Sequence, residues 1–237
     1  MTLPVIHRVA QLDLKFQSWS WSWPFAEERR ADIDAHFAVK QREKPKIWNG
    51  RIVMARNPVF TANRFSACYS DVDFASFLAW RDWGFPDRSV FNGFGMGALR
   101  CSDGAFVLGE MSQHTANAGR IYFPSGTPDL NDVSGGAVDM PGSVGREVEE
   151  ETGLTSKDYR PGAHWDCVVS GSAIALIQIL DVDGSGQALQ ARIEANLARQ
   201  SQAEFAAIHL VRASSDLTSA MPRFVTAFIE AQLAAPS

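Results

Sequence analysis

A short acidic stretch in the middle of the chain constrains its fold more than any other feature. Residues 146–154 read Arg-Glu-Val-Glu-Glu-Glu-Thr-Gly-Leu. In a helix, Glu147, Glu150 and Glu151 stand at positions i, i+3 and i+4, so their carboxylates share one face. Like charges at these spacings repel one another and weaken an isolated helix. The stretch therefore predicts a helix whose acidic face is stabilised by something else, and a bound cation would do so.

The residues on either side indicate where this helix begins and ends. Asp139, followed by Pro141, fits a helix N-cap with proline in the first turn. Gly153 fits the position just past the C-terminal end, where a residue without Cβ turns left-handed. We expect a helix from about Met140 to Thr152. Carboxylate oxygens are the ligands that Mg²⁺ or Mn²⁺ prefers.

The nine residues from Arg146 to Leu154 resemble the second half of the Nudix box, Arg-Glu-U-x-Glu-Glu-x-Gly-U with U aliphatic, at every defined position. A solvated acidic helix face is the simpler interpretation, but it does not account for the arginine, the aliphatic residues and the glycine. The resemblance implies an α/β fold, a Nudix-type α/β/α sandwich with a mixed sheet. It also implies metal-dependent hydrolysis of a nucleoside diphosphate linked to another moiety, which is a pyrophosphatase activity.

The resemblance implies roles for individual residues. Glu147, Glu150 and Glu151 carry over as ligands of Mg²⁺ or Mn²⁺, with Glu150 and Glu151 also counted as catalytic. Arg146 carries over as the residue that orients Glu147 by ion pairing. Water would attack phosphorus in the diphosphate while the metal neutralises charge on the oxygens. Glu204 is our candidate for a base from a distant loop; a solvated residue before a strand is the open alternative.

The upstream half of the box departs from the family pattern Gly-x5-Glu-x7-Arg. Val138 stands where the family has Glu, and Asp132 stands where it has Gly. Asp129 and Asp139 are the two candidates to replace the missing carboxylate. A folded but non-catalytic Nudix domain, kept as a ligand sensor or scaffold, is therefore an alternative to the enzyme.

A better match for the missing glycine loop lies further upstream. Phe-Pro-Ser-Gly-Thr-Pro-Asp at residues 123–129 resembles the family's Pro-Gly-Gly-x-x-Glu loop, with six extra residues before Arg146. The backbone of Gly126 would approach the metal and the diphosphate, because glycine has no side chain to block it. Arg120, His114 and Asp129 are candidates for substrate contact.

Composition excludes several classes of function. The 237 residues are 46% hydrophobic and 21% charged, as in a soluble globular protein. The net charge of −5 argues against a nucleic-acid partner, and no apolar run is long enough for a membrane span. Cys68, Cys101 and Cys167 are too widely spaced for a metal pair or a disulfide framework. We therefore expect a cytoplasmic protein that acts on a small-molecule nucleotide, with a homodimer left open.

The chain divides into an N-terminal extension, residues 1–90, and a Nudix domain, residues 91–237. The extension holds six of the seven tryptophans, so we expect it to pack on the core. Its tryptophans at 19, 21 and 23 alternate with serines and favour a strand. We expect the following elements in the extension: one or two strands over 7–23, a helix from 24 to 45, two strands over 51–70 that turn at Asn57-Pro58, and a helix over 74–83.

The second region reads as strands interleaved with helices. A hairpin over 95–110 turns at Asp103-Gly104, a strong turn signal. A long strand over 165–183 contains Gly171, which we interpret as a bulge or bend. A helix over 187–200, a strand over 205–212 and a helix over 221–234 complete the prediction.

The substrate is suggested by a weaker similarity. The extension, with Ile-Trp-Asn-Gly at 47–50 and the helix over 74–83, is similar to a small Nudix branch whose mammalian member splits UDP-glucose and UDP-galactose. By this similarity the substrate is a UDP-sugar, split into UMP and a sugar 1-phosphate. A pyrophosphatase of the coenzyme A or ADP-ribose type is the alternative.

Overall fold

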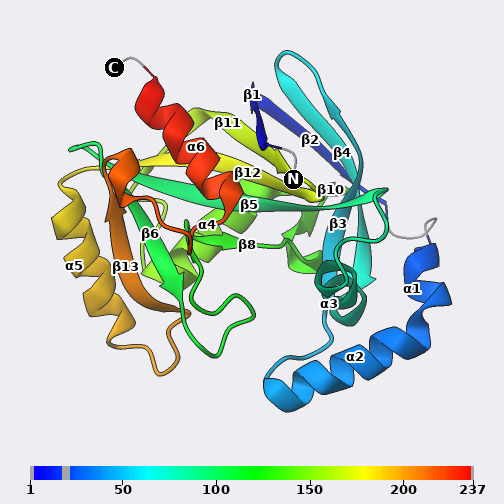
Figure 1. Cartoon of the computed structure of the whole chain (residues 1–237). Coiled ribbons are helices and arrows are strands. Elements are labelled where there is room, and N and C mark those ends of the chain that lie inside the picture. The colour runs from blue at the N-terminus through cyan, green and yellow to red at the C-terminus, as the bar shows by residue number, and fades with distance from the viewer. Residues whose placement is uncertain (1–2, 18–21, 236–237) are drawn as a thin grey trace.

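One mixed β-sheet joins both regions of the chain in a computed structural model that describes residues 3–17 and 22–235 (Figure 1). The strands follow one another across the sheet as β1 (Val5–Val9), β11 (Arg160–Ser170), β12 (Ala173–Val182), β5 (Val90–Cys101), β3 (Arg51–Phe60), β4 (Arg64–Asp73), β2 (Gln11–Phe16), β10 (Ala137–Val138) and β9 (Val133–Ser134). Off this path lie β6 (Phe106–Met111), β7 (Ile121–Tyr122), β8 (Ser125–Gly126) and β13 (Phe205–Val211). The expected α/β class with a mixed sheet is confirmed.

Strand β5 pairs with strands from several parts of the chain. It pairs in parallel with β12 from Asn92 to Cys101 and antiparallel with β3 at its start, where Phe91 faces Ala55. Its far end pairs with β6, and Gly95 pairs with Gly126 of β8. Because β5 touches the N-terminal strands, the glycine loop and the core strands, it fixes their relative positions.

Helices cover both faces and the ends of the sheet. They are α1 (Pro24–Glu28), α2 (Arg30–Glu43), α3 (Phe74–Asp82), α4 (Met140–Thr152), α5 (Gly186–Leu197) and α6 (Arg223–Ala234), with short 3-10 turns η1 (Leu130–Asp132) and η2 (Ser214–Asp216). Figure 1 shows α6 crossing the front of the sheet, α5 along β13, and α1 to α3 gathered at the opposite end. None of the helices in the described ranges is long and apolar enough to cross a membrane.

Strands of the N-terminal region pair with strands from the rest of the chain. Strand β1 adds to the edge of the core sheet beside β11, with Val5 opposite Val169. Strand β2 pairs in parallel with β4 and also contacts β10 through Lys15 and Ala137. A smaller hydrophobic core lies under α1 to α3, centred on the fully buried Trp80. Strand pairing thus connects the N-terminal region to the core sheet, while the division into residues 1–90 and 91–237 stays a prediction.

Most expected elements are present, including the helix over 74–83, the hairpin at Asp103-Gly104 and the helix that begins at Met140. The predicted 24–45 helix is broken into α1 and α2 at Arg29. Cys68, Cys101 and Cys167 are free. Of the alternating tryptophans, those at positions 19 and 21 lie outside the described residues.

The predicted turn at Asn57-Pro58 is wrong. Strand β3 runs straight through both residues, and its register against β4 shifts between Arg56 and Val59. Asn57 adopts a left-handed φ of 51°, which asparagine tolerates better than most residues. A bulge accommodates the proline, which has no N–H to donate. The chain reverses instead at residues 61–63.

The predicted bend at Gly171 is also wrong, because the run over 165–183 is not one strand. It forms the hairpin of β11 and β12, in which Ser170 pairs with Ala173 across a two-residue turn. Gly171 there has φ of 62°, which a glycine reaches without strain. Because the residues on both sides of the turn are apolar, the sequence predicted one continuous strand.

Packing of α4 on β5 depends on glycine, which gives a first prediction. A Cβ on Gly95 would lie 2.5 Å from Val144 Cγ2 and 2.8 Å from Met140 Sδ. Gly95→Ala should therefore lower the free energy of unfolding by about 1–3 kcal/mol, measured by urea denaturation. Gly162→Ala is the matched control, because its Cβ would meet Ile179 no closer than 3.4 Å. Equal stability of the two variants would contradict this account.

Candidate active site

Helix α4 presents one apolar face to the sheet and one acidic face to the glycine loop. Met140, Val144 and Val148 are buried against β5. The side chain of Asp139 caps the helix by accepting from the amide of Gly142 at 3.0 Å. These contacts fix which carboxylates point toward β8.

Glu151 is the most deeply buried of the three carboxylates. Only 2% of the residue is exposed, and its Oε2 accepts a hydrogen bond from the amide of Ser125 at 3.0 Å. Burial raises its pKa well above the usual range, and the charges of Glu147 and Glu204 raise it further, while the Ser125 bond opposes the shift. In the absence of a cation this site favours a protonated carboxyl group.

Glu147 lies directly against the glycine of the same loop. A Cβ on Gly126 would collide with its carboxylate, so the loop can approach only because residue 126 is glycine. Burial raises the pKa of Glu147 to about 7; Arg146 opposes this shift, and Glu150 and Glu204 add to it. Glu150, by contrast, has a side chain that is 57% exposed.

Arg146 makes the ion pair that the sequence leads us to expect. One Nη1 contact reaches Glu147 Oε1 at 2.8 Å, and a longer one reaches Glu150 Oε2 at 3.5 Å. Its Nη2 contacts Asp132 Oδ2 at 3.1 Å. Burial lowers the pKa of Arg146, but the charges of Glu147 and Asp132 raise it above its ordinary value. The guanidinium therefore stays charged and is held from two sides.

Asp132 is the residue that sequence reasoning missed. It is 6% exposed, and besides Arg146 its Oδ2 accepts from the amide of Asp129 at 3.0 Å. Asp129 and Asp139, expected to replace the missing carboxylate, instead cap η1 and α4. Val138 is buried in the main core. A carboxylate fourteen residues before an arginine gives no helical or strand register, so only the folded loop brings the pair together.

Glu204 lies near the buried carboxylates, although it comes from the segment before β13. The residue is exposed, and its carbonyl accepts from the amide of Ser112 at 2.7 Å. Its charge contributes to the raised pKa values of both Glu147 and Glu151. The structure thus brings it toward the acidic face, and its role as a base stays a prediction.

The acidic face suits a hard divalent cation. Within residues 3–17 and 22–235, no three Asp, Glu, His or Cys side chains already converge as a finished ion site. The donors are nevertheless carboxylate oxygens, as Mg²⁺ or Mn²⁺ prefers. Glu151 is buried and Glu147 partly buried, and both have raised pKa values, which a nearby cation would lower. Glu147 and Glu151, with Glu150 turning in from the surface, are the residues that would hold such an ion.

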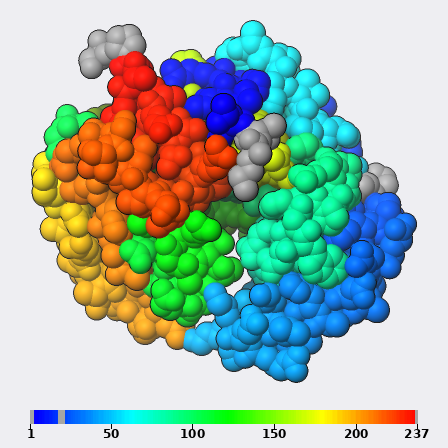
Figure 2. Space-filling model, viewed as in Figure 1, coloured from blue at the N-terminus to red at the C-terminus, as the bar shows by residue number. Residues whose placement is uncertain are grey.

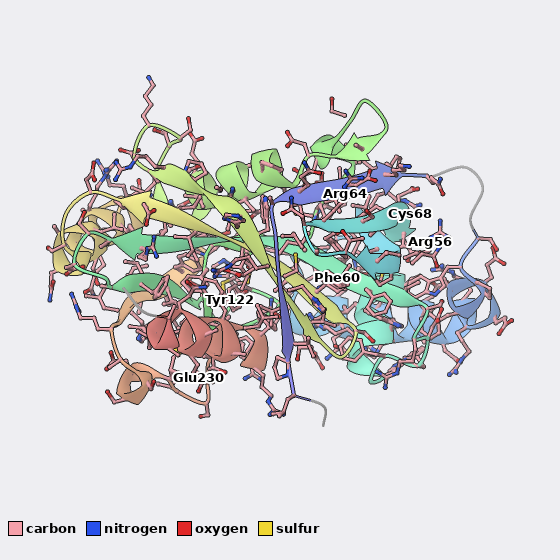
Figure 3. The ribbon with its side chains drawn as sticks, turned by 90° about the horizontal axis from the view of Figure 1, so that it is seen from above. Arg56, Phe60, Arg64, Cys68, Tyr122 and Glu230 are labelled. Atoms are coloured by element: carbon pink, nitrogen blue, oxygen red, sulfur yellow. The ribbon has the colours of Figure 1, made fainter. Side chains whose placement is uncertain are left out.

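Two cavities adjoin this face. The larger, about 560 Å³, lies between α3, β5 and the segments around residues 116–127 and 219–224. Figure 2 shows the hollow between the teal α3 region and the green loop before β7. Tyr122, labelled in Figure 3, lines it, and its hydroxyl accepts from Asn117 Nδ2 at 3.1 Å. The smaller, about 260 Å³, is lined in part by Asp129, Arg146 and Glu147.

The candidate substrate residues fall in different places. Arg120 lines the large cavity, with its Nη1 3.5 Å from the carbonyl of Ser219. Asp129 lines the small cavity. His114 is exposed in the loop before β7 and is not part of the described lining of either cavity. The structure therefore brings Arg120 and Asp129 toward the site and leaves His114 outside it.

Comparisons with known proteins give structural likenesses. The chain matches no family model and no curated protein. A MutT protein from Methanosarcina mazei Go1 is 19% identical with a TM-score of 0.40, covering 60% of this chain and 91% of that chain. RenU, a Nudix hydrolase from M. smegmatis, is 14% identical with a TM-score of 0.40, covering 62% and 91%. A Nudix hydrolase from Nitrosomonas europaea is 16% identical with a TM-score of 0.32, covering 51% and 71%.

Two of these descriptions name the family that residues 146–154 resemble. In this chain the matched residues lie on α4 and end at Gly153, whose φ is 75°. Upstream of these residues, Asp132 of η1 contacts Arg146 from the loop that precedes α4.

Removing the charge of Asp132 tests its contact with Arg146. Asp132→Asn should lower the free energy of unfolding by about 1–2 kcal/mol, toward the low end because solvent reaches the arginine. Asp181→Asn, at an exposed pair with Arg100, is the control and should change stability by about 0–1 kcal/mol. Chemical denaturation measures both; an unchanged Asp132 variant would count against the assignment.

Proposed function

We propose that this protein is a metal-dependent Nudix-type pyrophosphatase that hydrolyses a nucleoside diphosphate linked to another moiety. The observation that carries the proposal is a pair of carboxylates, the buried Glu151 and the partly buried Glu147, held against Ser125 and Gly126. Buried like charges are costly unless a cation is bound, and they lie beside a cavity large enough for a nucleotide.

Each residue has a role that its position supports. Glu147, Glu150 and Glu151 would hold Mg²⁺ or Mn²⁺, which when bound neutralises charge on phosphate oxygens and lowers the pKa of water. Arg146 orients Glu147 through their ion pair and opposes the rise in its pKa. Glu204 would accept a proton from the attacking water, whose oxygen bonds to phosphorus as the bridging P–O bond breaks and the second phosphate leaves.

For the substrate, we propose a UDP-hexose, cleaved to UMP and a sugar 1-phosphate. A chain of net charge −5 suits a small nucleotide better than a polynucleotide. The aromatic residues that the N-terminal region adds to the large cavity offer apolar faces for a pyrimidine. A coenzyme A or ADP-ribose substrate, or a sensor without catalysis, are the outcomes that would replace this proposal.

A nucleotide panel assayed with and without Mg²⁺ tests the activity and the substrate. We expect UDP-sugars to be cleaved only with metal, and hydrolysis in ¹⁸O-water to place the label on one product phosphate. Activity confined to ADP-ribose or coenzyme A would support the pyrophosphatase activity and contradict the UDP-sugar substrate. Binding without turnover of any member would favour the sensor.

Substitutions on α4 test the carboxylates. Glu150→Gln and Glu151→Gln should each lower turnover at least about a hundredfold, because each removes a ligand charge. Glu149→Gln is the matched control, since Glu149 is an exposed glutamate of the same helix. Near-normal turnover in the first two variants, or an equal loss in the control, would remove the catalytic assignment.

Thermal melts separate metal binding from catalysis. Mg²⁺ should raise the Tm of the wild type, because a ligand that binds the native state stabilises it as RT ln(1 + [L]/Kd). Glu151→Gln should show a much smaller shift with Mg²⁺ and an equal or higher Tm without it, since the neutral amide is cheaper to bury. Superimposable wild-type melts in EDTA and in excess Mg²⁺ would argue against a metal site.

A further inference from the structure

The large cavity has an aromatic wall that the N-terminal region supplies. Phe74 and Phe77 of α3 and Phe85 just after it line one side. Phe94 and Phe224 line it from β5 and α6, with ring centroids 5.4 Å apart in an edge-on arrangement. Aromatic faces suit flat rings, and stacking on them is tolerant of base identity. This wall therefore favours a planar group.

One of these rings is held in an unfavourable backbone conformation. Phe85 has φ of 62°, its amide donates to the carbonyl of Trp80 at 2.8 Å, and its ring meets Trp80 edge-on at 4.7 Å. A bulky residue in this region costs free energy and persists only where its surroundings impose it. The strain places Phe85 at the cavity, which favours a binding role.

The same cavity carries positive charge. Arg81, Arg120 and Arg223 line it, and its described lining includes no aspartate or glutamate. Arg81 also pairs with Asp82 at 3.2 Å, so Arg120 is the guanidinium on which the assignment below rests. A flat group that carries a phosphate matches both the rings and the arginines.

The small cavity has a different chemistry. Trp48 stands at it with 75% of its surface exposed, and its ring lies so close to Gly50 that a Cβ there would come within 2.8 Å. Arg51 and Asp129 line the same space. An indole face beside a carboxylate and a guanidinium suits a ring with apolar C–H faces and hydroxyl groups at its edge.

The two cavities meet at the acidic face of α4. Phe74 and Thr127 line both of them. Gly126 lines the large one and Glu147 the small one, and these two residues are in contact. A group that connects an occupant of one cavity to an occupant of the other therefore passes the carboxylates.

We propose that the two cavities divide one substrate, with the nucleoside in the large cavity and the polyhydroxylated sugar in the small one. The diphosphate then crosses Gly126-Thr127 beside Glu147. This proposal rests on the proposed function. It assigns base binding to Phe85 and Arg120, and sugar binding to Trp48, which makes the N-terminal region part of both subsites.

The two halves of the substrate serve as probes in calorimetric titrations with Mg²⁺ present: UMP and glucose 1-phosphate. Phe85→Leu and Arg120→Gln should each raise the Kd for UMP at least about tenfold and change that for glucose 1-phosphate less than about twofold, since each removes a contact to one half only. Trp48→Ala should raise the Kd for glucose 1-phosphate at least about tenfold and change that for UMP less than about twofold. Trp48→Phe should restore sugar phosphate binding.

Val59→Ala is the matched control, because Val59 is exposed on β3 and lies in neither cavity lining. Melting temperatures check that each variant is folded, and the exposed Arg120 gives a result even where the Phe85 change destabilises. Loss of UMP binding in Trp48→Ala, or equal losses of both probes in every variant, would overturn the division.

The nucleotide panel separates the two possible failures. Wild-type cleavage of UDP-sugars together with undivided variant effects would overturn the subsites and leave the proposed function. No cleavage of any nucleotide and no binding of either half would overturn both. A change in oligomeric state on Trp48→Ala, with both Kd values unchanged, would mark the tryptophan as a contact between copies and overturn the sugar subsite.

Discussion

The close approach of two acidic side chains, the buried Glu151 and the partly buried Glu147, on one face of α4 is the constraint around which the site is built. Glu151 is buried and Glu147 partly buried where α4 packs on β5 and β8 lies against them. Burial of charge is unfavourable on its own. A bound cation, as proposed above, would offset this cost.

Arg146 and Asp132 form the next set of contacts around Glu147. The arginine lies between Glu147 and a buried aspartate from the inserted loop, so its position is fixed from both sides. Asp132 is fixed in turn by the amide of Asp129 within η1. Position 138 holds a buried valine, and the carboxylate beside Arg146 comes instead from Asp132 of η1.

The N-terminal region shapes the space in which a substrate would lie. Its strand β1 extends the core sheet, and β3 joins the start of β5. Its helix α3 then forms a wall of the large cavity, while Trp48 stands at the small one. Cavities formed between two packed regions are common binding sites. Here the packing also fixes the distance of both cavities from α4.

Local sequence determined the elements whose signals are local. The bounds of α4, its Asp139 cap and its Gly153 end followed from short-range rules, as did the acidic face and the arginine beside it. The turns at residues 61–63 and at Gly171 were missed, because a bulge and an apolar run hid the reversals. Tertiary structure alone decided the Asp132 contact, the approach of Glu204 and the two cavities. These depend on residues far apart in sequence, whose meeting is set by sheet pairing and packing and leaves no periodic pattern.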